Sequence, residues 1–157
     1  MRRLILIVAA ALLAAALPAS AQPHFGARAG LTRTPNQIHV GAHAELFELA
    51  PALMFLPNVE IGFGAHVTTW SFNGELAWTL PVEALGSWQP YVGGGLAIVY
   101  SKFDLPASFD DTRTDVGLSV LAGMSTMLKL GHKFFTEVKV GLEDVPDLKI
   151  TAGLTLF

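Results

Sequence analysis

Residues 132–143, HKFFTEVKVGLE, decide the fold of this chain. Apolar side chains such as Val138 and Val140 alternate in them with charged ones such as Glu137 and Lys139. Side chains on a β-strand point to opposite faces with a period of two, whereas one face of a helix repeats every three to four residues. The stretch therefore predicts a strand with one apolar and one charged face.

The same alternation recurs along the rest of the chain, separated by turns rich in Pro, Gly, Asn and Asp. A membrane-spanning strand needs about 9–11 tilted residues, and single-chain bacterial barrels have an even number of strands. The pattern predicts an all-β fold, an eight-stranded antiparallel up-and-down transmembrane β-barrel. The expected strands are 24–32, 38–49, 52–66, 70–80, 89–103, 115–128, 132–143 and 147–157.

Two features indicate that the apolar face points outward, to lipid. The apolar face is almost free of charge along all eight strands, and most glycines lie on the charged face, where a narrow lumen leaves little space. Buried charges must be paired, so we expect a lumen plugged by a polar network. Its predicted members are Arg28, Glu45, Glu60, Glu75, Glu137, Lys139 and Lys149. Aromatic girdles are expected at Trp78, Trp88, Tyr91 and Tyr100.

The first 21 residues predict a cleavable signal peptide, with residues 22–157 forming the barrel domain. Arg2 and Arg3 precede an apolar run over residues 4–17, and Ala-Ser-Ala at 19–21 is typical of a cleavage site. That run is shorter than the roughly 20 residues of a membrane-spanning helix. Export and the barrel pattern together predict the bacterial outer membrane.

Composition excludes several classes of function. Without the two arginines of the signal peptide, eight basic residues remain against thirteen acidic ones, a formal net charge of −5, so no nucleic-acid partner is expected. The chain has no cysteine. His39 and His43 would lie about 13 Å apart on a strand, too far for a shared metal, and the acidic residues between 104 and 115 lack calcium-loop spacing. We expect no metal and no cofactor.

A hydrolase site is a weaker interpretation, and we expect no enzyme activity. Nucleophilic catalysis needs a nucleophile, a base within hydrogen-bond reach and an acid that orients the base. His66, Thr68 and Glu75 offer these groups, but with threonine in place of serine.

The motifs PYVGGGL (90–96), VLAGM (120–124), FTEVK (135–139) and AGLTLF (152–157) give a resemblance to a known group. In order and spacing they resemble the small eight-stranded outer-membrane barrels of the OmpA/opacity-protein type. The resemblance implies that Phe157 is read by the outer-membrane assembly machinery. In this chain the apolar positions of the alternation are Leu154 and Leu156, which puts Phe157 on the opposite face of the strand. Either a bulge precedes Phe157 or it lies outside the regular register.

The sequence thus predicts a monomeric barrel with a structural or surface-interaction role, whose expected partners are outer-membrane lipid, the assembly machinery and an unidentified external ligand. The loops expected outside are 33–37, 67–71, 104–114 and 144–146. Three alternatives remain open: a narrow transporter for small hydrophobic molecules, a membrane-embedded lipid hydrolase, and a soluble periplasmic barrel that binds an apolar ligand.

Overall fold

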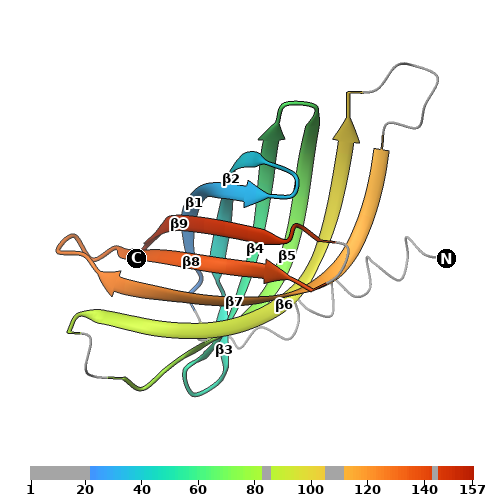
Figure 1. The fold of residues 1–157 in the computed structure, drawn as a ribbon. Coiled ribbons are helices and arrows are strands. Elements are labelled where there is room, and N and C mark those ends of the chain that lie inside the picture. The colour runs from blue at the N-terminus through green and yellow to red at the C-terminus, as the bar shows by residue number, and fades with distance from the viewer. Residues whose placement is uncertain (1–21, 83–85, 105–111, 143–144) are drawn as a thin grey trace.

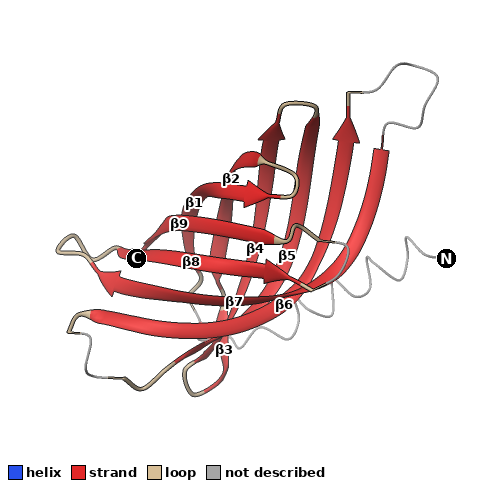
Figure 2. Ribbon diagram, in the orientation of Figure 1, coloured by secondary structure: helices blue, strands red, loops and turns tan. Residues whose placement is uncertain are grey.

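The computed structural model describes residues 22–82, 86–104, 112–142 and 145–157, and every regular element in these ranges is a β-strand (Figures 1 and 2). The predicted signal peptide, 1–21, lies outside the described residues. No helix among the described residues is long and apolar enough to cross a membrane. The strands are β1 (His24–Arg33), β2 (Gln37–Glu45), β3 (Phe47–Ala50), β4 (Leu53–Gly64), β5 (Val67–Thr79), β6 (Trp88–Phe103), β7 (Thr112–Met127), β8 (Lys133–Gly141) and β9 (Leu148–Leu156).

Apart from β2 and β3, which do not pair with each other, consecutive strands pair antiparallel, and β1 pairs with β9, so the sheet closes on itself. The second strand of the barrel is divided into β2 and β3 at Leu46, and both parts pair with β4. The backbone N–H of Leu46 still donates to the carbonyl oxygen of Phe55 at 3.1 Å. The prediction of a closed, eight-stranded antiparallel barrel is therefore confirmed.

One predicted loop, 67–71, is wrong. These residues begin β5, where Val67 pairs with Phe103 of β6 and Thr68 pairs with Phe63 of β4. Threonine and valine are strong strand formers, so the run of β-branched residues continues the ladder instead of ending it. The connection between β4 and β5 consists of residues 65–66 alone.

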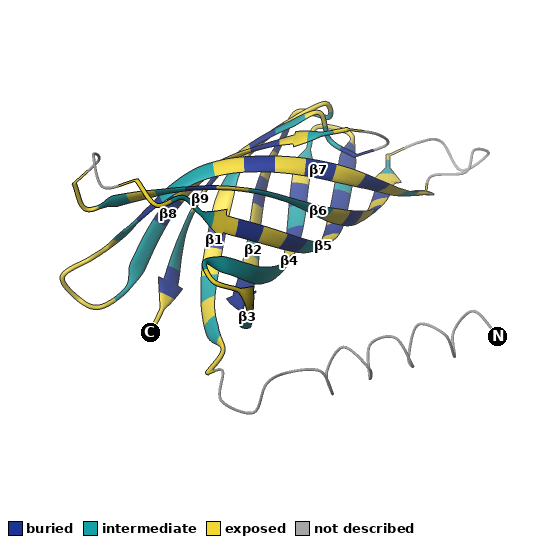
Figure 3. Cartoon of the chain, turned by 90° about the horizontal axis from the view of Figure 1, so that it is seen from below, coloured by how far each residue is buried: buried dark blue, intermediate teal, exposed yellow. Residues whose placement is uncertain are grey.

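Buried and exposed residues alternate along the strands, which Figure 3 shows as bands on β5, β6 and β7. The outward positions carry large apolar side chains, as the sequence predicts. They include Phe25, Leu31, Ile38, Val40, Val59, Phe63, Trp70, Phe72, Leu76, Trp78, Val92, Leu96, Ile98, Val116, Leu118, Val120, Val138, Val140, Ile150 and Leu156. Because charged and polar side chains occupy the interior, the barrel is inside out relative to a water-soluble one.

Glycines on the inward face make room for rings from neighbouring strands. A Cβ on Gly123 would collide with the ring of Tyr91, and a Cβ on Gly153 would collide with the ring of Phe135 and the carbonyl oxygen of Ala27. Tyr91 was expected in an aromatic girdle, but it is only 9% exposed and points into the lumen. The space left by Gly123 is the physical reason, because it accommodates the phenol ring inside a narrow barrel.

Candidate functional site

An ion-pair network around Arg28 fills the middle of the lumen. Its guanidinium contacts Glu137 at 2.7 Å, Glu60 at 3.2 Å and Glu75 at 3.9 Å, and all four side chains are at most 3% exposed. The sheet neighbours of β1 are β2 and β9, whereas the three carboxylates come from β8, β4 and β5. One side chain therefore connects strands across the lumen.

Two lysines complete the network on the side of Arg28 that faces the loop end of the barrel, the end that carries the β1–β2 and β4–β5 connections. Lys149 Nζ donates to Glu60 at 2.6 Å and lies 3.4 Å from Ser71 Oγ. Lys139 forms an ion pair with Glu75, which also accepts a hydrogen bond from Asn58 Nδ2 at 2.9 Å. Each buried carboxylate of this layer thus has a cationic partner, the condition under which buried charge is tolerated.

A separate polar group lies near the end of the barrel where β1 begins and β9 ends. Glu45 pairs with Lys133 and accepts a hydrogen bond from Thr155 Oγ1 at 3.3 Å. His43 Nε2 lies 2.9 Å from that same hydroxyl. Because the hydroxyl proton goes to the carboxylate, the oxygen accepts from His43, which places the imidazole proton on Nε2.

All seven residues predicted for the lumen network lie buried in the interior. Sequence reasoning did not include Lys133 among them, although it lies on the charged face of its strand. With it, these inward-facing residues comprise four glutamates (45, 60, 75 and 137) and four cations: Arg28, Lys133, Lys139 and Lys149. Asp115 also faces inward, with a side chain 16% exposed, and it forms an ion pair with Arg113 at 2.6 Å.

Apolar side chains close part of the lumen as well, and the alternation did not reveal them. Tyr91, Leu121 and Phe135 pack together with Ala77 inside the barrel. The Tyr91 hydroxyl donates to Glu137 at 3.1 Å, so this cluster joins the ion network. A signal was present in the sequence, because the alternation puts Leu121 and Phe135 on the same face as the charged residues of their own strands.

Val145, in the connection between β8 and β9, also turns its side chain inward. Val145 is 7% exposed and packs against Ala97 and Val99 on the inner face of β6. Residues 144–146 are predicted as an external loop; residue 144 lies outside the described residues, and the side chain of Val145 turns from this connection into the lumen. A branched apolar side chain is better accommodated there than in water, which favours the inward turn.

A cavity of about 200 Å³ remains in the lumen on the side of the chain termini. Arg28, Phe135 and Glu137 line it together with residues at its mouth, such as Glu48 and Lys133. At about 30 Å³ for each water molecule, the volume corresponds to roughly seven waters. The cavity is a blind vestibule, because Arg28 and its partners occupy the lumen beyond it.

The other candidate constellations do not assemble. His39 bonds to Thr32 and Thr151, whereas His43 bonds to Thr155, and His66 lies in the turn between β4 and β5. In the described residues there is no group of three or more His, Asp or Glu side chains that could hold a metal ion. Part of the acidic loop, residues 105–111, lies outside the described residues.

The hydrolase arrangement is also not formed. Thr68 has the outward parity of Trp70, whereas Glu75 points inward. The two residues are seven positions apart on β5, about 23 Å along a strand. At that separation, and on the opposite face of the strand, Glu75 cannot orient a base beside Thr68.

Phe157 lies one residue beyond the end of β9 and is 55% exposed. Its ring is 4.0 Å from that of His24, and Lys133 Nζ lies 5.8 Å from its centroid. Of the two expected arrangements, the structure shows the one in which Phe157 lies outside the regular register.

No family model and no curated protein matches this chain. Among solved structures it is similar to the crystal structure of Neisserial surface protein A, with 14% identity over 85% of this chain and 94% of that one and a TM-score of 0.65. The N-terminal β-barrel domain of Pseudomonas aeruginosa OprF gives 13% identity over 87% and 98%, also at 0.65. The outer membrane enzyme PagL gives 10% identity over 87% and 99%, with a TM-score of 0.50. The chain therefore has the fold of the small eight-stranded outer-membrane β-barrels.

Proposed function

We propose that the chain is an outer-membrane β-barrel with a closed, non-conducting lumen and a structural or surface-interaction role. The observation that carries the proposal is the inverted distribution of side chains. The exposed positions along the described strands hold large apolar residues, and the buried ones hold the ion-pair network. Such a surface is stable against lipid and would aggregate in water.

Several contacts support a closed lumen. Arg28 holds carboxylates from three strands that are not its neighbours, and Val145 covers the interior at the loop end. Moving an ion through this layer would require separating pairs in a low-dielectric interior, which costs several kcal/mol for each uncompensated charge. The network therefore acts as a fixed plug.

The structural or surface-interaction role is supported by the fold and by the length of the described connections. One protein of similar fold is named as a surface protein. The described connections at the loop end between β1 and β2 and between β4 and β5 are only three and two residues long, over 34–36 and 65–66. Short loops favour a structural role or a small contact over an elaborate adhesive surface. Among the described residues, no contact supports the transport alternative or the hydrolase alternative.

The first test is the heat-modifiability of the protein in an outer-membrane fraction. A closed barrel should run as a fast band on SDS gels without boiling and shift to the unfolded position on heating. A soluble protein without a shift would contradict the membrane assignment and favour the soluble-barrel alternative.

The second test addresses the lumen. Folded protein in a planar lipid bilayer should give no stepwise current, with a known open porin as the positive control. Regular single-channel steps from the wild-type chain would exclude the plug and favour the transport alternative.

A further inference from the structure

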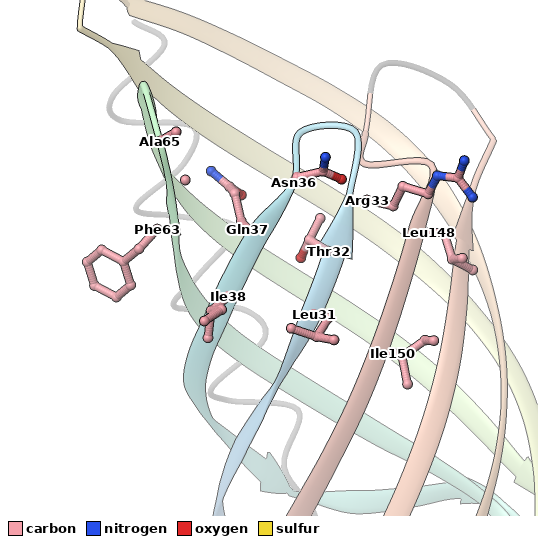
Figure 4. A pocket seen from close by; sticks show the side chains of 11 residues that line it. Leu31, Thr32, Arg33, Asn36, Gln37, Ile38, Phe63, Ala65, Leu148 and Ile150 are labelled. Carbon is pink, nitrogen blue, oxygen red and sulfur yellow. The ribbon is translucent and has the colours of Figure 1, made fainter.

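A groove of about 540 Å³ runs across the outer surface of β1, β2, β4 and β9 near the loop end of the barrel. Figure 4 shows its residues, with Leu31 and Ile38 on the β1–β2 hairpin between Phe63 and Ile150. It lies on the outside of the wall, distinct from the lumen network.

The floor of the groove is an apolar row set by strand register. Leu31 pairs with Ile150 on one side and with Ile38 on the other, and Ile38 pairs with Phe63. All four side chains are 52–61% exposed. Four neighbouring strands of the sheet, β9, β1, β2 and β4, thus present apolar side chains at the same height on the barrel wall. Such a surface is suited to a hydrocarbon chain.

Arg33 lies two residues beyond Leu31 on β1, between this row and the loop end of the barrel. It has the same outward parity as Leu31, pairs with Leu148 across β1 and β9, and is exposed. Among the described residues that line the groove it is the only charged one, and it forms no ion pair with any described residue. A cation at the upper edge of a lipid-facing surface lies at the depth of lipid headgroups.

The other polar residues of the groove are mostly engaged elsewhere. Gln37 accepts from Thr69 Oγ1 at 2.9 Å and donates to the carbonyl oxygen of Val67 at 3.1 Å. Thr32 is bonded to the ring of His39. Asn36, in the hairpin turn, remains as a neutral hydrogen-bonding partner beside Arg33. Within the described part of the chain, the groove therefore offers one cation without an ion-pair partner and one amide above an apolar floor.

We propose that this groove binds a phosphate-bearing lipid of the leaflet at the loop end of the barrel. The acyl chain lies over Leu31, Ile38 and Phe63, and the phosphate is bound by Arg33 and Asn36. Charge complementarity selects the occupant, because none of the described residues that line the groove carries a carboxylate and guanidinium groups bind phosphate in bidentate geometry. The inference rests on the proposed function, since it requires the barrel to be embedded in a bilayer.

The test uses folded protein in dodecyl maltoside micelles and two probe lipids that differ only in the phosphate, phosphatidic acid and diacylglycerol with identical chains. Bound lipid is counted by native mass spectrometry. Wild-type protein should bind phosphatidic acid more tightly, and Arg33→Gln should weaken that binding about fivefold, the effect of one cation near a membrane surface. Phe63→Ala should weaken the binding of both lipids.

Lys102→Gln is the matched control, because Lys102 is an exposed cation near the loop end of β6 that does not line the groove. It should change the affinity for phosphatidic acid less than twofold. Equal binding of the two lipids by wild-type protein, or equal effects of Arg33→Gln and Lys102→Gln, would overturn the lipid site and leave the barrel proposal intact. Protein that shows no heat-modifiable form would instead refute the proposed function on which the site depends.

Discussion

Replacing Arg28 with methionine should destabilise the barrel more than any other single change in the lumen network. Arg28 lies 2.7 Å from Glu137, and without it the described partners of that carboxylate are the Tyr91 hydroxyl at 3.1 Å and Lys139 at 3.9 Å. Glu60 retains Lys149 at 2.6 Å. One buried carboxylate is left nearly uncompensated, which costs about 3–5 kcal/mol in the free energy of unfolding.

The assay is urea unfolding of the protein in phospholipid vesicles, followed by tryptophan fluorescence and by the heat-modifiable gel shift. Adding Glu137→Gln to Arg28→Met should recover about 2 kcal/mol, because it removes the orphaned charge. The matched control is Lys102→Met, an exposed cation on β6 outside both the lumen network and the groove, which should change stability by less than about 0.5 kcal/mol. A loss below about 1 kcal/mol for Arg28→Met, or no recovery in the double variant, would refute the argument that the network is a dry, paired plug.

Three further outcomes test other parts of the structure. Gly153→Val should lose about 1–3 kcal/mol in the same urea titration because its side chain collides with Phe135, whereas Gly74→Ala, whose nearest neighbour would be a ring atom at 3.7 Å, should stay within about 0.5 kcal/mol. Val138→Arg, at the middle of β8 on the outer face, should lose about 2–4 kcal/mol in lipid vesicles, and an unchanged midpoint would argue against a lipid-facing surface there. Phe157→Ala should slow the appearance of the heat-modifiable form in cells while changing the stability of the folded barrel by less than about 1 kcal/mol, since the ring is 55% exposed.

Alternation made most of the fold predictable from the sequence, because a period of two assigns each residue to one of two faces. The charge-free face of the strands and the glycines on the opposite, charged face indicated which face is inside. Strand ends were less predictable: the β-branched Thr68 and Thr69 favour a strand, but where the ladder ends depends on the partners they meet on β4 and β6. The inward turn of Val145 was also hidden, because it depends on the space beside Ala97 and Val99.

The candidate site was predictable in its members but not in its connections. Parity placed the charges of the network on one face, but the partner of each charge is set by which strands meet across the lumen. Arg28 and Glu137 are 109 residues apart in sequence and 2.7 Å apart in space, a pairing that follows from barrel closure. The partner choices of Lys139 and Lys149 depend on the same closure.

Because the side-chain distribution is inverted, the residues that stabilise this barrel differ from those available for binding. A water-soluble protein is stabilised by apolar burial, but lipid tails are as apolar as the outer face, so that term contributes little once the chain is in the bilayer. The ladder of backbone hydrogen bonds and the paired lumen charges must then hold the barrel together. Substitutions at Arg28 or Glu60 should therefore act through stability, whereas substitutions at Arg33 should leave the barrel folded and alter only what it binds. An exposed arginine above an apolar row, held on a wall stabilised from within, is thus free to serve recognition.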